Sequence, residues 1–159
     1  MRFKHLYRRF LMTLAVIPAL FTAHTSSAAD DTTLSGLNHG DNTMKIRFVF
    51  DDRSVTATLK DTPSVRDFVS QLPLTMELED YASTEKIAYL PSKLTREGAP
   101  NGTKSKAGDI SYYAPWGNLV IFYKDFGHAS GLINLGKLDG GLERFTAERS
   151  PTVTIELVD

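Results

Sequence analysis

The feature that most constrains the fold of this chain is a series of short runs in which apolar and polar residues alternate. The first run covers residues 45–50, and a second covers residues 55–60. Side chains of a β-strand point alternately to its two faces, so each run predicts a strand with one buried face. The polar residues 51–54 supply turn chemistry between the two runs, and together these segments predict a β-hairpin.

One segment has helical spacing instead. Four apolar residues between Val65 and Leu72 recur at intervals of three and four, which places them on one face of a helix. Thr62 is suited to cap the N-terminus of this helix, and Pro63 is suited to its first turn, where a missing N–H costs nothing. We therefore expect a helix over Ser64–Leu72 that packs against one end of the strands.

The rest of the chain reads as further short strands. Apolar or alternating runs occur at 74–78, 87–90, 110–113, 119–123, 132–135 and 153–157, with a helical turn around Leu142–Phe145. The run 119–123 is apolar at every position, which predicts a strand buried on both faces. Residues 91–109, rich in glycine and proline, are expected to form a long surface loop.

About eight short strands and one or two short helices predict a mainly β fold. A closed antiparallel barrel satisfies this pattern, because closure removes exposed sheet edges. The residues expected in its core are Phe48, Phe50, Val55, Leu59, Phe68, Leu72, Ile121, Phe122 and Ile155.

The first 29 residues have the layout of a secretory signal peptide. Arg8 and Arg9 precede an apolar run of about a dozen residues, and small residues follow as far as Ala29. A membrane anchor is the alternative, but this run is shorter than the roughly 20 residues that span a bilayer. We expect cleavage near Ala29, a flexible leader over 30–43, a domain over 44–159, and a periplasmic or secreted mature protein with no membrane span.

Composition excludes several function classes. The chain has no cysteine, so a disulfide framework, a thiol nucleophile and a thiolate metal site are excluded. Only His39 and His128 remain after the expected cleavage, and no residues have metal-ligand spacing, so we expect no metal and no cofactor. Without residues 1–29 the chain has 14 basic and 19 acidic residues, a net charge of −5 that argues against a nucleic-acid partner.

Several motifs together carry a family resemblance. They are the helix segment 62–68, the apolar strand 118–122, the Gly-rich segment 135–143, and the stretches 78–81, 85–91 and 108–118. Together with the hairpin that precedes them, these segments resemble those of cyclophilins and, more closely, of small bacterial cyclophilin-like proteins of uncharacterised function. The resemblance implies a cyclophilin-like barrel of eight strands closed by two helices.

The resemblance does not extend to the catalytic motif of true cyclophilins. Those enzymes isomerise prolyl peptide bonds with an arginine on a barrel strand, followed by a Gln-Gly-Gly-Asp sequence. The matching stretch here, residues 85–94, contains neither. The chain is therefore expected to be a non-catalytic module that binds a peptide or small ligand at the barrel mouth. The alternative is a prolyl isomerase that uses a displaced donor, Lys86 or Arg96.

An aromatic cluster is the first candidate for the ligand site. Tyr112, Tyr113 and Trp116 are close in sequence, and Asn118 follows with a side chain suited to orienting a ligand amide. Ordinary core filling is the alternative for the rings. Trp116 differs because it lies in a Pro-Trp-Gly-Asn turn, which predicts a pocket rim or an exposed position.

Acidic residues beside an aromatic are the second candidate. Glu79 and Tyr81 lie in the stretch 78–81, and Glu85 begins the stretch 85–91; both stretches carry the resemblance. These three residues are predicted to contribute to the same pocket. The alternative is that they are solvated residues at strand ends.

Overall fold

The long hairpin predicted at the start of the domain is present. The computed structural model describes residues 42–51 and 53–158; the predicted signal peptide and nearly all of the predicted leader lie outside these ranges. Strands β1 (Thr43–Val49) and β2 (Ser54–Lys60) pair over their full length, from Thr43 opposite Lys60 to Val49 opposite Ser54. Every second residue of β2 is buried, and so are Ile46 and Phe48 of β1, as the alternation predicts; Met44 of β1 is half-buried.

Helix α1 (Pro63–Val69) follows this hairpin. The Thr62 hydroxyl accepts a hydrogen bond from the Val65 amide at 3.3 Å, so Thr62 caps the helix as expected. The helix is shorter than predicted, because α-helical geometry ends at Val69 and only turns continue towards Leu72. Phe68 is fully buried, while Leu72 is half-buried and packs against the core.

The remaining strands complete one large antiparallel sheet. They are β3 (Leu74–Glu77), β4 (Glu79–Tyr81), β5 (Glu85–Tyr89), β7 (Asp109–Tyr113), β8 (Asn118–Phe122), β10 (Leu132–Leu138) and β11 (Thr152–Leu157). Their order across the sheet is β3-β11-β1-β2-β10-β7-β8-β5-β4.

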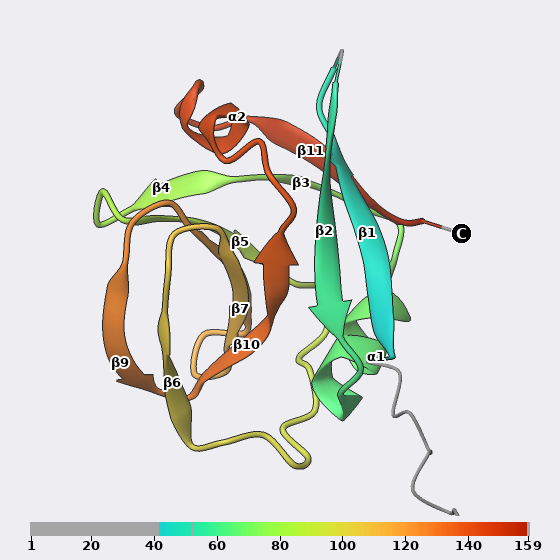
Figure 1. The fold of residues 1–159 in the computed structure, drawn as a ribbon, viewed down its shortest axis with the longest axis vertical. Helices are drawn as coiled ribbons and strands as arrows, with labels where there is room; N and C mark the ends of the chain where they lie inside the picture. Colours follow the sequence, from blue (N-terminus) through green and yellow to red (C-terminus); the bar gives the residue numbers. More distant parts are fainter. Residues whose placement is uncertain (1–41, 52, 159) are drawn as a thin grey trace, which may run out of the picture. The chain divides into compact units, whose positions relative to one another are not determined.

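The two edges of this sheet are parts of one continuous segment. β3 pairs with β11 and β4 pairs with β5, and only Leu78 separates β3 from β4. The segment therefore leaves one neighbour and joins the other at Leu78, which closes the sheet on itself. Counted as one strand, β3–β4 makes a ring of eight, so the predicted mainly β, antiparallel eight-stranded barrel is confirmed (Figure 1).

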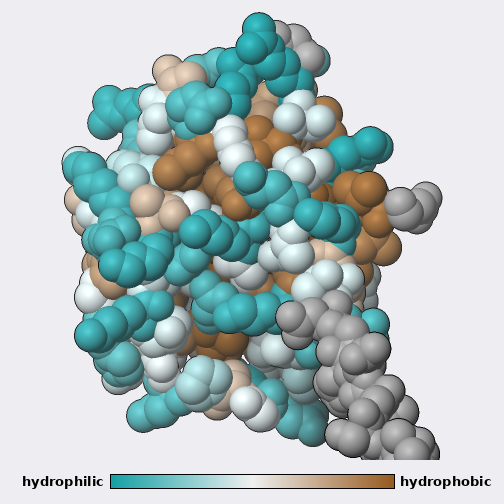
Figure 2. All heavy atoms as spheres, in the orientation of Figure 1, coloured by the Kyte–Doolittle hydropathy of each residue, from teal (hydrophilic) through white to brown (hydrophobic). Residues whose placement is uncertain are grey.

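The inner face of the barrel wall forms the main core. Inward-facing side chains from every barrel strand except β4 join residues of both helices there, and the core includes Phe48, Leu119 and Ile155. Helix α2 (Glu143–Thr146) contributes Phe145, whose ring packs edge-on against Phe48 and Phe50. Apart from Leu72, the predicted core residues are all buried. Hydrophilic side chains cover most of the face shown in Figure 2.

The outer face of the barrel carries a second, smaller hydrophobic cluster. It contains Ile87, Val120, Phe122 and Leu132. A two-stranded ribbon, β6 (Gly102–Ser105) paired with β9 (Phe126–Ser130), lies beside this part of the wall (Figure 1).

This ribbon was not predicted. The segment expected to be one long loop, residues 91–109, contains β6, which has no alternating pattern. The prediction that residues 119–123 are buried on both faces is confirmed for 119–122, because every residue of β8 is buried, whereas Tyr123 is half-buried. No helix in the described part of the chain is long and apolar enough to cross a membrane.

Candidate functional site

A cavity of about 180 Å³ lies against the outer face of the barrel, at the ribbon. Its floor is formed by alternate residues of β8, among them Val120 and Phe122, and by Leu132 of β10. Phe126 and Ala129 of β9 line it from the ribbon, and the Phe126 ring stacks on Phe122. The cavity is therefore on the wall of the barrel and not at its mouth, where we expected the ligand.

Strand alternation explains why β8 can serve two purposes. Leu119 and Ile121 point inward and belong to the main core, whereas Asn118, Val120 and Phe122 point outward and line the cavity. The same barrel strand thus stabilises the fold with one face and forms a cavity floor with the other.

Asn118 gives this apolar floor a polar group without a partner. Its side chain is buried, with 1% of its surface exposed, and Nδ2 donates to the Leu119 carbonyl at 3.4 Å. Oδ1 has no hydrogen-bond partner among the described residues. A buried carbonyl oxygen without a partner costs about 1–3 kcal/mol, so a hydrogen-bond donor entering the cavity would be stabilised there.

Three aromatic side chains form one side of the cavity. The Trp116 ring meets the Tyr81 ring edge-on at a centroid distance of 5.3 Å and the Tyr113 ring in the same way at 5.4 Å. Trp116 lies in the turn between β7 and β8 and is 44% exposed, as predicted for a rim residue.

Exposed aromatic side chains concentrate around this cavity. Five large hydrophobic residues of the described chain are exposed, and three of them line the cavity: Tyr81, Trp116 and Phe126. A fourth, Tyr89, is the register partner of the cavity residue Asn118. Clusters of exposed apolar side chains on a soluble domain are typical of binding sites.

Glu85 is the single carboxylate that lines the cavity. It lies opposite Tyr81 on β4 and opposite Phe122 on β8. The side chain is half-buried among these rings, and burial raises the pKa of its carboxyl from 4.5 to about 7. The group therefore changes its charge near neutral pH.

The structure brings together five of the seven predicted site residues: Tyr81, Glu85, Tyr113, Trp116 and Asn118. The other two do not line the cavity. Tyr112 points into the barrel, where it is 1% exposed and its hydroxyl accepts a hydrogen bond from the Leu94 amide at 3.2 Å. Glu79 is an exposed residue of β4.

Sequence reasoning missed the apolar part of the site. Phe122 was assigned to the core, Val120 was not singled out, and the ribbon residues Phe126 and Ala129 were not considered. The sequence did contain a signal for this part of the site. The apolar run 119–122 of β8 needs apolar neighbours on both sides of the barrel wall, and the core supplies them on one side only.

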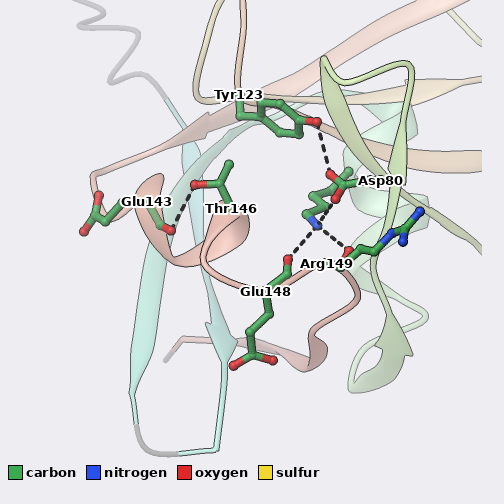
Figure 3. Close-up of polar contacts among 7 residues, drawn as sticks. Asp80, Tyr123, Glu143, Thr146, Glu148 and Arg149 are labelled. Carbon is green, nitrogen blue, oxygen red and sulfur yellow. Dashed lines mark hydrogen bonds and ion pairs between the residues drawn. The ribbon is translucent and has the colours of Figure 1, made fainter.

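The two displaced donors considered for an isomerase do not line the cavity. Lys86 points to the other side of β5, is fully buried, and makes an ion pair of 3.0 Å with Asp80. Its Nζ also donates to the carbonyl oxygens of Glu148 and Arg149, at 2.8 and 2.6 Å (Figure 3). Arg96 is exposed in the loop after β5.

The Lys86 contacts therefore serve the fold. All three N–H groups of its ammonium have an acceptor, so none remains for a substrate. Asp80 also accepts a hydrogen bond of 3.1 Å from the Tyr123 hydroxyl, and burial together with this contact raises the pKa of Tyr123 (Figure 3). The described residues contain no group of three or more side chains suited to holding a metal ion.

Comparison with known proteins agrees with this architecture. The family model described as the Cyclophilin-like family matches residues 48–156, which is most of the chain. The chain belongs to the Cyclophilin-like family. Among solved structures, this Cyclophilin-like protein is similar to a hypothetical protein from Archaeoglobus fulgidus. The two are 16% identical, with a TM-score of 0.55 over 77% of this chain and 100% of the archaeal one. That likeness shows a shared fold. None of the curated proteins is significantly similar to the chain in sequence.

Proposed function

We propose that this Cyclophilin-like domain is a non-catalytic module that binds a small ligand, or a side chain of a peptide, in the cavity on its barrel wall. The observation that carries the proposal is the unpartnered Oδ1 of Asn118 at the floor of an aromatic cavity. A protein that needed this position only for packing would gain stability from an apolar side chain of the same size.

The surrounding residues support binding over catalysis. Polar groups in the cavity are few, and most of its lining is apolar, as is usual for small-molecule sites. Prolyl isomerisation needs a fixed hydrogen-bond donor aimed at the twisted amide, and no lysine or arginine lines the cavity.

The experiment is an NMR screen of a small-fragment library against the domain, with amide shifts of β8 and β9 as the readout. We expect fragments to shift these amides in the wild-type domain. In Asn118→Leu we expect binding to weaken by at least about tenfold, with stability equal to wild type or higher. A fragment library that leaves β8 and β9 unshifted would refute the proposal.

Trp116→Ala tests the aromatic rim. Because Trp116 is 44% exposed, its removal leaves no closed cavity, and we expect the free energy of unfolding to change by less than about 1 kcal/mol. Fragment affinity should fall by at least about tenfold. A loss of more than about 3 kcal/mol, the range for a truncated core aromatic, would make Trp116 a structural residue and contradict its assignment to the site.

We also propose that the chain is exported, with residues 1–29 acting as a signal peptide. The layout of this segment supports the proposal: basic residues, a short apolar run, then small residues. N-terminal sequencing of the protein from the periplasm or medium should find a start near Asp30. Recovery of intact chain, with Met1 retained, in the membrane fraction would favour the anchor instead.

A further inference from the structure

The only charged side chain among the described residues that line the cavity is acidic. Glu85 contributes a carboxylate, and none of the other lining residues is a lysine, an arginine or a histidine. The acceptor Oδ1 of Asn118 lacks a donor, and the remaining polar groups are the phenols of Tyr81 and Tyr113, which donate or accept, and the indole N–H of Trp116, which donates. At Glu85 and Asn118 the cavity thus offers negative charge and acceptors, and a ligand complementary to these two groups offers positive charge and donors.

The two acceptors stand at opposite ends of the cavity floor. Glu85 lies opposite Phe122, the last residue of β8, whereas Asn118 is the first residue of that strand. Four residues of β8, roughly 13 Å at 3.3 Å per residue, separate the backbone position of Asn118 from that of Phe122, the register partner of Glu85. Acceptors anchored this far apart along the strand favour an elongated ligand.

The Glu85 end is the end suited to a cation. Tyr81 is the register partner of Glu85, and its ring meets Trp116 at 5.3 Å. A carboxylate beside the rings of a tyrosine and a tryptophan attracts an ammonium group by charge and by cation–π interaction. At the other end Asn118 lies in register with Tyr113 and has no charged group beside it among the lining residues. A neutral N–H donor therefore suits that end better than a second charge.

The middle of the cavity is apolar and small. Val120 lies between the two ends of β8, and Leu132 and Ala129 line the same space. The cavity volume of about 180 Å³ is similar to the roughly 150 Å³ of a cavity that binds one benzene molecule, so it admits a short aliphatic chain but not a length of peptide.

From these features we propose that the ligand is a small aliphatic amine, with an ammonium group at Glu85, an apolar chain over Val120, and an amide-like N–H donor at Asn118. This inference rests on the proposed function, because it names the ligand of the same cavity.

Ionisation of Glu85 then controls affinity. Burial raises the pKa of its carboxyl to about 7, so the negative charge that attracts the ammonium is present at pH 8.5 and absent at pH 5.5. The other titratable groups near Glu85 are two phenols, Tyr81 from β4 and Tyr123 beyond β8. Neighbouring Lys86 points to the opposite side of the wall, where Asp80 pairs with it. His128 of β9 is exposed and does not line the cavity.

Three matched probes test the proposal: 5-aminopentanamide, pentanamide, which lacks the ammonium, and pentylamine, which lacks the amide. Trp116 is the single tryptophan of the chain, so its fluorescence reports binding directly, and β8 amide shifts provide a second readout. At pH 8.5 we expect 5-aminopentanamide to bind at least about tenfold more tightly than either truncated probe. Its advantage over pentanamide should shrink at least fivefold at pH 5.5.

Two variants test whether Glu85 causes the preference for the ammonium group. Glu85→Gln should remove both the advantage of the ammonium and its pH dependence, whereas Glu79→Gln, a carboxylate of β4 outside the cavity, should leave both unchanged. Equal affinity of pentanamide and 5-aminopentanamide at pH 8.5 would overturn the cation assignment, and equal affinity of pentylamine would overturn the donor assignment. Failure of all three probes, while other fragments shift β8 and β9, would overturn this inference and leave the proposed function standing. Failure of every fragment as well would overturn both.

Discussion

Replacing Lys86 with methionine or alanine tests whether the contacts of this buried lysine with the segment after α2 stabilise the fold. Lys86 is 0% exposed, and its Nζ binds Asp80, the Glu148 carbonyl and the Arg149 carbonyl. Both carbonyls belong to the connection between α2 and β11, which carries no regular structure of its own. We therefore expect the loss of this ammonium to destabilise the fold without touching the cavity.

The magnitude follows from what each variant removes. Lys86→Met keeps an apolar side chain of similar length but leaves two carbonyl oxygens and Oδ2 of Asp80 without the lysine donor, while Oδ1 of Asp80 keeps the Tyr123 hydroxyl. Because the Asp80 side chain is 36% exposed, water restores part of its solvation, and we expect a loss of about 2–3 kcal/mol. Lys86→Ala also removes the buried aliphatic stem, which adds about 2 kcal/mol. The total, about 4–5 kcal/mol, is a large part of the 5–15 kcal/mol that stabilises a typical domain.

Urea unfolding followed by far-UV circular dichroism measures both variants against wild type. Lys106→Met is the matched control: that lysine also pairs with an aspartate, Asp125, but its side chain is 74% exposed, so its urea midpoint should not move. A Lys86→Met domain within about 1 kcal/mol of wild type would refute the reasoning. Equal losses in the Met and Ala variants would show instead that the buried stem contributes nothing.

Three further predictions concern backbone packing, pH and catalysis. A Cβ on Gly136 would lie 2.2 Å from the Thr58 carbonyl oxygen, so Gly136→Ala should force β10 away from β2 and cost at least about 2 kcal/mol in urea unfolding; an unchanged midpoint would contradict this. Because the pKa of Glu85 is about 7 when folded and 4.5 as a free group, the folded state binds the proton more strongly in that range, and stability should fall as pH rises from 4.5 to 7. Glu85→Gln should flatten this part of the profile, and a slope that survives the substitution would show that another group causes it. Finally, isomerisation of an X–Pro test peptide should stay on its uncatalysed timescale of tens to hundreds of seconds; a rate that grows with protein concentration would establish the isomerase alternative.

The barrel could be predicted because its strands carry the pattern that burial of one face requires. The alternation in residues 45–50 and 55–60 corresponds directly to the buried positions of β1 and β2. Thr62 and Pro63 likewise begin helix α1 for local reasons that the sequence states by itself. The ribbon strands β6 and β9 have no such alternation, and their pairing depends on partners that are distant in sequence.

The candidate site was only half predictable for a related reason. Tyr112 and Tyr113 are adjacent, so a strand must send them to opposite sides, and composition does not tell which one faces the core. Glu79 and Glu85 look alike in sequence, yet only Glu85 lines the cavity. Register decides these questions, and register is set by the whole sheet.

The separation of the two hydrophobic clusters has a consequence for local unfolding. The cavity floor belongs to barrel strand β8, while the side facing it belongs to β9 of the β6–β9 ribbon. The ribbon meets the barrel through the small cluster around Val120 and Phe122 and through the buried contact of Ser105 with Ser111. A ribbon with so little buried apolar surface can detach while the barrel remains folded, so its amides should exchange with solvent far faster than those of β8. Entry to the cavity would then be governed by a local opening equilibrium, and a ligand that bridges ribbon and barrel would slow amide exchange in the ribbon first.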